Sequence, residues 1–369
     1  MIRRLYIHNF RCLENFELPI SGLSSALLIG KNGAGKSTVG FALEILQKIA
    51  RGTNGVADLV KEKDFAQGRK DAPMRFEIEV ELDKTIYAYG IGFELRPDFK
   101  ELGVLEENLT VGGKPVYTRQ KAQVHLVKTR KVGEARFLID WHLVALPIVQ
   151  EQPPEDSLSI FKQWLARMLI LRPVPSLILG ESKQETLQPN LQVTNFAAWF
   201  SGLIAYAPAA YSKIDEYLKQ VMPDFKDIQN PANGPDSKSL TVQFSNKQGS
   251  LKLAFEDLSD GEKCFMICAL VLAANNAYGP VLCFWDEPDN YLVLSEVGDA
   301  VLALRKAFQS GGQFIATSHN PEAIDRFSRE NTLLLYRKSH LEPTLVRPLS
   351  EIQVNGDLVS ALVRGDVEP

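Results

Sequence analysis

The feature that most constrains the fold of this chain is a glycine-rich octapeptide, GKNGAGKS, at residues 30–37. A short apolar run at residues 26–29 precedes it, and a segment with apolar residues at helical spacing, from Lys36 to about Arg51, follows it. Glycines let backbone N–H groups approach an anion closely, and a helix N-terminus adds a positive dipole. A buried strand, a glycine-rich turn and a helix in this order predict a loop that cradles a phosphate chain.

The last two residues of the octapeptide carry the predicted chemistry. Lys36 is expected to reach the β- and γ-phosphates of a nucleotide, and Ser37 to place its hydroxyl on Mg²⁺. A chance glycine-rich turn between a strand and a helix is the simpler alternative. Because every position of the pattern occurs together in the required context, we favour a nucleotide site.

A second motif is a carboxylate pair, Asp286 and Glu287, directly after the apolar run 281–285. Ligands of parallel sheets lie at the C-terminal edge of the strands, where this pair is expected. Asp286 is then the acid associated with Mg²⁺, and Glu287 the general base or water-positioning residue. The alternative for such a pair alone is a solvated strand end.

Two further segments narrow the class of protein. Residues 258–263, LSDGEK, precede a segment that is apolar nearly all round, so Ser259 and Gly261 are expected at the N-terminus of a buried helix, where an anion can bind. A plain N-cap is the alternative interpretation. His319 follows the apolar run 313–317 and could present a neutral imidazole to a γ-phosphate, although a lone histidine is usually structural.

Along the chain the glycine-rich loop comes first, then LSDGE, then the carboxylate pair after its apolar run, and then Ser318-His319. Four motifs in this order resemble the ABC-type ATPase heads of the RecF, SMC and OLD group. The opening segment 7–16, IHNFRCLENF, also resembles the first hairpin of that group. The chain is identified as an OLD-like ATP-binding protein of the AAA type without the nuclease domain, for which the segment after His319 is too short. Residues 82–250 lack the long heptad arms of SMC proteins.

The resemblance implies a role for each matching residue. Lys36, Glu287 and His319 would be catalytic, Ser37 and Asp286 would hold Mg²⁺, and Arg11 falls where some relatives contact nucleotide phosphates. The ATP-binding residues would be Gly30, Lys31, Asn32, Gly33, Ala34, Gly35, Lys36, Ser37 and Thr38. The signature segment, which acts on the ATP of a partner subunit, would comprise Ser259, Asp260, Gly261 and Glu262.

The predicted fold is an α/β P-loop NTPase, an ABC-ATPase-like head. Apolar strands alternate with helices at both ends of the chain, which favours a mostly parallel sheet formed by both termini around an inserted α+β middle region. Residues 1–60 would form the N-terminal lobe, 61–239 a β-rich and then helical insertion, and 240–369 the C-terminal lobe. Within the insertion, 157–171 and 195–222 are predicted to be helical.

Composition limits the partners. With 41 Lys and Arg against 45 Asp and Glu, the net charge of −4 argues against a sequence-indifferent nucleic-acid coat protein. The four cysteines have no metal or disulfide spacing and fit a reducing cytoplasm, and the longest apolar run, 264–274, is too short to span a membrane. A basic cluster predicts either a solvated sheet face or a surface for nucleic acid or another partner: Arg119, Lys121, Lys128, Arg130, Lys131 and Arg136.

The function that follows is a cytoplasmic ATPase that dimerises around Mg²⁺-ATP. As a homodimer or higher oligomer it would regulate a separate effector, a nuclease or toxin, in bacterial anti-phage defence or DNA repair. A RecF-like DNA-binding repair ATPase and the ATP-binding subunit of a transporter are the alternatives. No glutamine is assigned to the Q-loop, for which Gln67 and Gln184 are the candidates by position.

Overall fold

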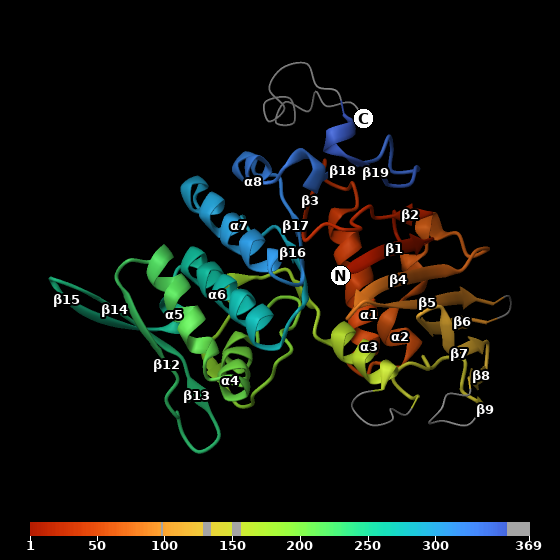
Figure 1. The fold of residues 1–369 in the computed structure, drawn as a ribbon, viewed down its shortest axis with the longest axis horizontal. Coiled ribbons are helices and arrows are strands. Elements are labelled where there is room, and N and C mark those ends of the chain that lie inside the picture. Colours follow the sequence, from red (N-terminus) through yellow and green to blue (C-terminus); the bar gives the residue numbers. More distant parts are fainter. Residues whose placement is uncertain (97–98, 128–133, 150–155, 353–369) are drawn as a thin grey trace.

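The computed structural model describes residues 1–96, 99–127, 134–149 and 156–352. At its centre stands a six-stranded sheet, in which all neighbours are parallel except the last pair (Figure 1). Its strands in spatial order are β10 (Leu169–Leu171), β16 (Leu282–Asp286), β17 (Gln313–Thr317), β3 (Ser25–Ile29), β18 (Thr332–Tyr336) and β19 (Leu345–Pro348). The mostly parallel sheet drawn from both ends of the chain is confirmed, with one edge strand, β10, supplied by the middle region.

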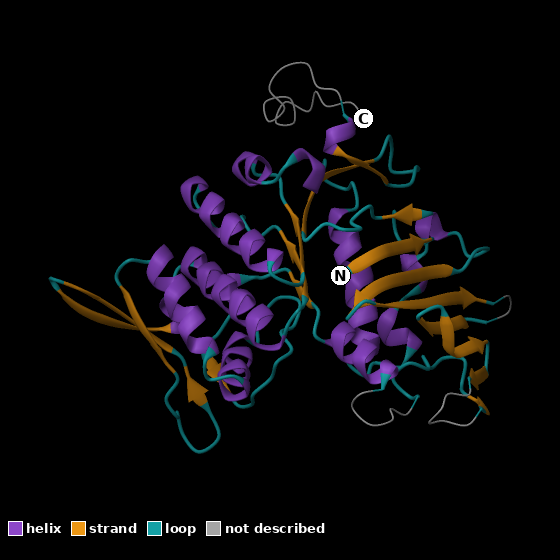
Figure 2. Cartoon of the chain, in the orientation of Figure 1, coloured by secondary structure: helices purple, strands orange, loops and turns teal. Residues whose placement is uncertain are grey.

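An eight-stranded antiparallel sheet covers one side of the molecule. It joins strands of the N-terminal segment to strands of the middle region, because β4 pairs along nearly all of β1 (Figure 2). Its strands in spatial order are β2 (Phe16–Glu17), β1 (Ile2–His8), β4 (Met74–Leu82), β5 (Thr85–Leu95), β6 (Leu102–Val111), β7 (Lys114–Gln120), β8 (Gln123–Leu126) and β9 (Ala135–Leu138).

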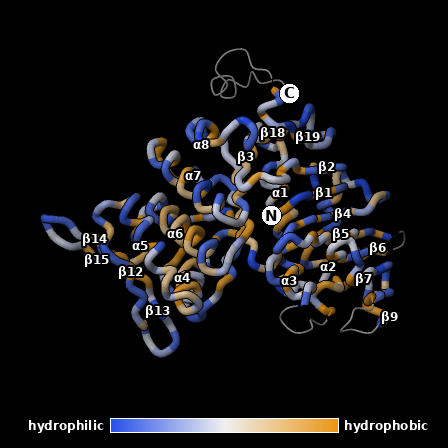
Figure 3. Tube along the Cα trace, viewed as in Figure 1, coloured by the Kyte–Doolittle hydropathy of each residue, from blue (hydrophilic) through white to orange (hydrophobic). Residues whose placement is uncertain are grey.

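The central sheet separates two hydrophobic cores. Along β3, Ala26 and Leu28 face one core and Leu27 and Ile29 the other, as the two-residue period of a strand requires. Three helices lie between the central and antiparallel sheets: α1 (Lys36–Ala50), α2 (Val56–Leu59) and α3 (Ser157–Ala166). The opposite face is covered by α4 (Phe196–Tyr206), α5 (Ala210–Val221), α6 (Asp260–Tyr278) and α7 (Leu294–Gln309), and α8 (Pro321–Arg326) follows β17. Figure 3 shows hydrophobic residues concentrated along the central strands and α6.

A smaller sheet lies beyond α5. Its strands are β12 (Phe225–Gln229), β14 (Thr241–Asn246) and β15 (Gly249–Ala254), and the β14–β15 hairpin projects from the body of the protein (Figure 1). Two short strands, β11 (Glu181–Ser182) and β13 (Lys238–Ser239), pair beside it.

Two predicted helices differ from the structure for local reasons. The segment 157–171 is helical only to Ala166, and its last three apolar residues form β10 instead, beside the buried strand β16. The segment 195–222 is two helices, because Pro208 between them cannot supply the backbone N–H that a continuous helix needs.

Candidate nucleotide site

The glycine-rich loop connects β3 to α1, as predicted. Gly30, Gly33 and Gly35 have positive φ angles of 142°, 80° and 99°, a region that favours glycine. A Cβ atom on Gly30 would lie 2.0 Å from the carbonyl oxygen of Leu335, and one on Gly35 would lie 2.9 Å from the Sγ of Cys12. The backbone path and its close neighbours therefore both require glycine at these two positions.

Lys36 lies in the first turn of α1, with only 6% of its surface exposed. Its Nζ donates hydrogen bonds to the carbonyl oxygens of Gly30, at 2.8 Å, and of Lys31, at 3.4 Å. Burial lowers the pKa of the ammonium, and the carboxylates of Glu287 and Asp286 partly offset this effect. The loop thus holds a cation next to the carboxylates of β16.

Asp286 ends β16, and its side chain is 7% exposed. One carboxylate oxygen accepts a hydrogen bond of 2.6 Å from the hydroxyl of Thr317, the last residue of the adjacent strand β17. The other oxygen lies 3.7 Å from the Nε of Arg172. Mg²⁺ prefers oxygen ligands and is usually held by one or two carboxylates together with phosphates and water, so the Asp286 carboxylate and the Ser37 hydroxyl suit it chemically.

Glu287 adopts an unusual backbone conformation, with a φ of 54°. Its N–H donates a hydrogen bond of 2.9 Å to the hydroxyl of Thr317, and its Oε2 accepts one of 2.5 Å from the Asn290 amide. Its Oε1 lies 3.8 Å from the Nε2 of His319. Left-handed backbone at a non-glycine residue persists only where neighbours hold it, and here Thr317 and Asn290 hold Glu287.

His319 follows β17 and is partly exposed. Burial and the positive charge of Lys36 lower its pKa below the ordinary value of 6.5, against the opposing effect of Glu287 and Asp286. The imidazole is therefore neutral at pH 7, so it can accept or donate a hydrogen bond. The structure brings together Lys36, Asp286, Glu287 and His319 at one edge of the sheet.

The signature segment forms an N-cap at the start of α6. The N–H and the hydroxyl of Ser259 each donate to Glu262 Oε2 at 2.7 Å, and the N–H of Glu262 donates to the Ser259 hydroxyl at 3.3 Å. This capping box is the alternative that the sequence left open. Among the described residues, no hydrogen bond or ion pair joins residues 259–262 to the glycine-rich loop or the carboxylate pair. Gly261 lies instead against the Tyr291 carbonyl, which would be 3.0 Å from an added Cβ.

Two contacts around the site had no clear signal in the sequence. Arg337, in the loop after β18, donates a hydrogen bond of 3.3 Å to the Gly33 carbonyl. Asp289 is buried, and one of its oxygens accepts a hydrogen bond of 2.9 Å from Ser318, while the other has no hydrogen-bond partner in the part of the chain that the structure describes. Burial raises the pKa of Asp289.

The basic cluster is not one surface. The Arg119 side chain is fully buried, lies 3.6 Å from the carboxylate of Glu107, and donates to the carbonyl oxygens of Lys121, Leu143 and Asp140. Its role is internal, which corrects its assignment to an exposed sheet face. Arg136 is exposed and pairs with Glu134, whereas Lys128, Arg130 and Lys131 lie outside the described residues.

Arg11, Gln67 and Gln184, also singled out in the sequence, each have a defined place in the structure. Arg11 pairs with Asp64 at 3.0 Å and stacks on the ring of Phe41, on the first helix after the loop. Gln67 donates to the Leu341 carbonyl. Gln184 lies near the β11–β13 pair, among the residues that line a small surface pocket.

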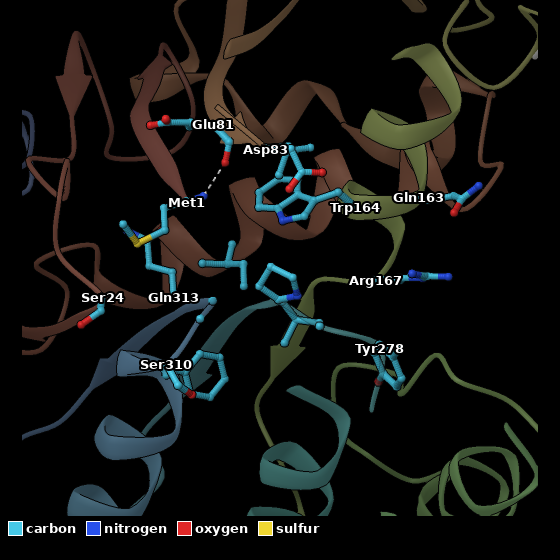
Figure 4. A pocket seen from close by; sticks show the side chains of 18 of the residues that line it. Met1, Ser24, Glu81, Asp83, Gln163, Trp164, Arg167, Tyr278, Ser310 and Gln313 are labelled. Carbon is cyan, nitrogen blue, oxygen red and sulfur yellow. Dashed lines mark hydrogen bonds between the residues drawn. The ribbon is translucent and has the colours of Figure 1, made fainter. Parts of the chain in front are cut away.

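A hollow of about 540 Å³ lies at the opposite, N-terminal edge of the central strands (Figure 4). Its lining includes Trp164 near the end of α3, Arg167 directly after that helix, and Gln313 at the start of β17. The N-terminal amino group of Met1 donates to the Glu81 carbonyl at 2.8 Å beside it. This hollow is on the far edge of the sheet from Lys36 and the carboxylate pair, so it is separate from the candidate nucleotide site.

A glycine-rich loop after one central parallel strand, with a carboxylate pair after the next strand but one, defines a P-loop NTPase. The chain belongs to the family described as "AAA domain, putative AbiEii toxin, Type IV TA system", whose model matches residues 25–325. It is also 44% identical, over 46 residues, to a protein named OLD nuclease from Thermus scotoductus (strain ATCC 700910 / SA-01). That match covers 12% of this chain and only 8% of the relative's length.

Solved structures show the same fold at low sequence identity. An SMC head bound to the C-winged helix domain of ScpA has a TM-score of 0.59 and 13% identity, over 95% of this chain and 99% of that one. An SMC head from Pyrococcus furiosus with an extended coiled coil, bound to the C-terminal domain of ScpA, has a TM-score of 0.54 and 13% identity, over 95% and 97%. With the family match, these confirm the predicted OLD-like, ABC-type ATPase head. No described helix has the length and apolar character needed to cross a bilayer.

Proposed function

We propose that this protein binds and hydrolyses Mg²⁺-ATP. The observation that carries the proposal is that buried Lys36 and the buried carboxylate of Asp286 lie close to Glu287 and His319 at one edge of the sheet. In P-loop NTPases catalysis comes chiefly from positioning and electrostatic stabilisation, which such a set of residues can provide.

Each residue has a defined part in this proposal. The glycine-rich loop and α1 bind the phosphate chain, and Lys36 offsets the charge of its β- and γ-phosphates. Ser37 and Asp286 would hold Mg²⁺, which neutralises phosphate charge when bound. Glu287 orients the attacking water and accepts its proton, and neutral His319 donates or accepts a hydrogen bond near the terminal phosphate.

We further propose that two copies of the chain associate through the signature face. Tyr291 and Val293, in the loop after the carboxylate pair, and Leu294, the first residue of α7, are 41%, 61% and 64% exposed. Tyr291 lies directly against Gly261, so the apolar side chains and the N-terminus of α6 share one region. Burying them against a second copy would bring the signature to the ATP held by the partner's loop.

The effector and the cellular role are proposals that rest on the relatives. The matched family carries a toxin–antitoxin description, and one relative is named a nuclease. These names favour an ATPase that regulates a separate nuclease or toxin in the cytoplasm of a bacterium, in anti-phage defence or DNA repair. Affinity purification of the tagged protein with the products of neighbouring reading frames would identify such an effector, and recovery of the ATPase alone would count against it.

The enzymatic proposal is tested by measuring phosphate release and mass together. The purified protein should release phosphate from ATP only when Mg²⁺ is present. Light scattering should detect a dimer with a hydrolysis-resistant ATP analogue and Mg²⁺, and a smaller species with ADP. A protein that binds ATP but never changes mass would refute the association of two copies, and one that releases no phosphate would refute hydrolysis.

A further inference from the structure

Arg172 is placed beside the metal-associated carboxylate by the register of the central sheet. Strands β10 and β16 are parallel neighbours, with Leu171 opposite Trp285. Arg172, the first residue after β10, therefore lies beside Asp286, the last residue of β16. The Nε of Arg172 is 3.7 Å from the Oδ2 of Asp286. The backbone N–H of Arg172 donates to the Leu191 carbonyl at 2.7 Å, which fixes the start of the segment that leads to α4.

The two oxygens of Asp286 have different partners. Oδ1 is occupied by the Thr317 hydroxyl, so Oδ2, the oxygen facing Arg172, is the one available to a metal ion. The carboxylate is 7% exposed whereas Arg172 is 56% exposed, so the arginine is the partner that is free to move. A divalent cation on Oδ2 would repel the adjacent guanidinium and compete for the same oxygen.

We propose that Arg172 is a nucleotide-sensing residue that moves between Asp286 and the terminal phosphate. Without Mg²⁺-nucleotide its guanidinium pairs with Asp286. When Mg²⁺ takes this carboxylate, the guanidinium turns to the γ-phosphate, whose oxygens match its planar set of donors. Arg172 thereby distinguishes a nucleoside triphosphate from a diphosphate. This inference rests on the proposed binding of Mg²⁺-ATP.

The chemistry of the site makes Arg172 distinct from Lys36. Lys36 belongs to the glycine-rich loop, where it is expected to contact phosphates of ATP and ADP alike. Arg172 reaches the site from β10, on the opposite side of β16 from the loop strand. Loss of Lys36 should therefore weaken the binding of both ATP and ADP, whereas loss of Arg172 should weaken only the binding of the triphosphate.

The test compares nucleotide affinities of Arg172→Gln and Arg172→Lys with those of the unmodified protein. Arg136→Gln, an exposed arginine on β9 paired with Glu134, is the matched control. Calorimetric titration is performed with Mg²⁺ and either ADP or a hydrolysis-resistant ATP analogue. Arg172→Gln should bind the analogue at least tenfold more weakly and ADP within about twofold of the unmodified protein, because charge-assisted hydrogen bonds to phosphate are strong. Arg172→Lys keeps the charge but not the planar donors, so its affinity for the analogue should lie between those of Arg172→Gln and the unmodified protein.

A second titration follows Mg²⁺ in the presence of ADP. The apparent affinity of the protein for Mg²⁺ should rise in Arg172→Gln, because the guanidinium no longer competes with Mg²⁺ for Asp286. Unchanged affinity for the analogue, equal loss for both nucleotides, or a fall in Mg²⁺ affinity would overturn the role of Arg172. If the unmodified protein itself binds neither nucleotide, the proposed function fails as well, which separates the two failures.

Discussion

The hydroxyl of Thr317 donates a hydrogen bond of 2.6 Å to the carboxylate of Asp286, across the paired ends of β17 and β16. The same hydroxyl accepts a hydrogen bond from the N–H of Glu287. One side chain therefore fixes the orientation of the metal-associated carboxylate and supports the strained backbone of the residue after it. His319 lies two residues after Thr317. The end of β17 therefore positions Asp286, Glu287 and His319 together.

Replacing Lys36 by alanine should abolish tight ATP binding, because the loop would lose the cation that it holds beside the phosphates. Isothermal titration with ATP and Mg²⁺ measures this. Lys48→Ala, on the solvent face of the same helix and paired with Glu44, is the control and should bind as the unmodified protein does. Unchanged ATP affinity in Lys36→Ala would refute the assignment of the nucleotide site.

Glu287→Gln should bind ATP, hydrolyse it slowly and accumulate as a dimer, since Asp286 still holds Mg²⁺ while the proton acceptor is gone. The Asn290 contact can persist, because a glutamine carbonyl also accepts a hydrogen bond. Light scattering with and without Mg²⁺-ATP detects the dimer. The double variant with Lys36→Ala should stay at the mass of the nucleotide-free protein. A Glu287→Gln protein that binds ATP yet keeps one mass would count against ATP-dependent association.

Mixing two inactive variants should restore activity if the signature of one subunit completes the site of another. One variant carries Lys36→Ala and the other Gly261→Arg. A mixed dimer contains one site with both defects and one with neither. Random exchange of equal amounts gives about half mixed dimers and so roughly a quarter of the unmodified ATPase activity.

Steady-state phosphate release and a pull-down through a tag on one variant are measured together in this mixture. The control mixes two differently tagged samples of Lys36→Ala, which should remain inactive. Mixed dimers without activity above either variant would mean that each subunit is self-contained.

Glu107→Ala should unfold at much lower urea concentration than the unmodified protein. Its buried carboxylate accepts hydrogen bonds from the hydroxyls of Tyr89 and Tyr117 and from the N–H groups of Ala145 and Leu146. Removing one member of a buried charged network costs about 3–5 kcal/mol. Glu106→Ala, which breaks a partly exposed pair with Arg75, should cost about 1 kcal/mol or less. Equal losses of unfolding free energy in Glu107→Ala and Glu106→Ala would refute the structural role of Glu107.

Asp289→Asn should raise the melting temperature at pH 7.5 and have less effect toward pH 4. Burial raises the pKa of Asp289 in the folded protein above its ordinary value of 3.8, so the folded protein holds this proton more tightly than the unfolded chain does. Stability is therefore lost as pH rises through the interval between the two values, and asparagine, which resembles the neutral acid, avoids that loss.

Thermal unfolding from pH 4.5 to 7.5 measures the difference between the Asp289→Asn variant and the unmodified protein. Asp325→Asn, on the exposed side of α8, should leave the melting temperature nearly constant relative to the unmodified protein. A stabilising effect of Asp289→Asn that does not grow with pH would contradict the raised pKa of this carboxyl.

Local patterns were sufficient to predict most of the site. The loop at Gly30 follows the apolar strand β3, and the carboxylate pair lies at the end of the apolar strand β16. Their positions can therefore be predicted from short stretches of sequence. Arg172 and Arg337 carried no such signal, because each reaches the site through strand pairing between distant parts of the chain. The strand β10 was missed for a related reason: three apolar residues after a helix are compatible with either structure until β16 provides a partner.

Charge alone also misplaced one residue. Arg119 belongs to a cluster of basic residues on a β-rich stretch, a pattern typical of a solvated sheet face. In the structure Glu107 on β6 and the carbonyls of a later loop enclose it. The sequence cannot indicate that a loop folds over that face, because the partners are separated by a dozen or more residues.

The position of β3 has a consequence for how the protein is made. This strand, from the first thirty residues, lies between β17 and β18, which are translated about three hundred residues later. While the ribosome is still producing the middle of the chain, the antiparallel sheet can already pair through β1 and β4, but β3 has neither of its neighbours. The glycine-rich loop therefore acquires its rigid support only near the end of synthesis, so a nascent or prematurely terminated chain does not have the completed nucleotide site.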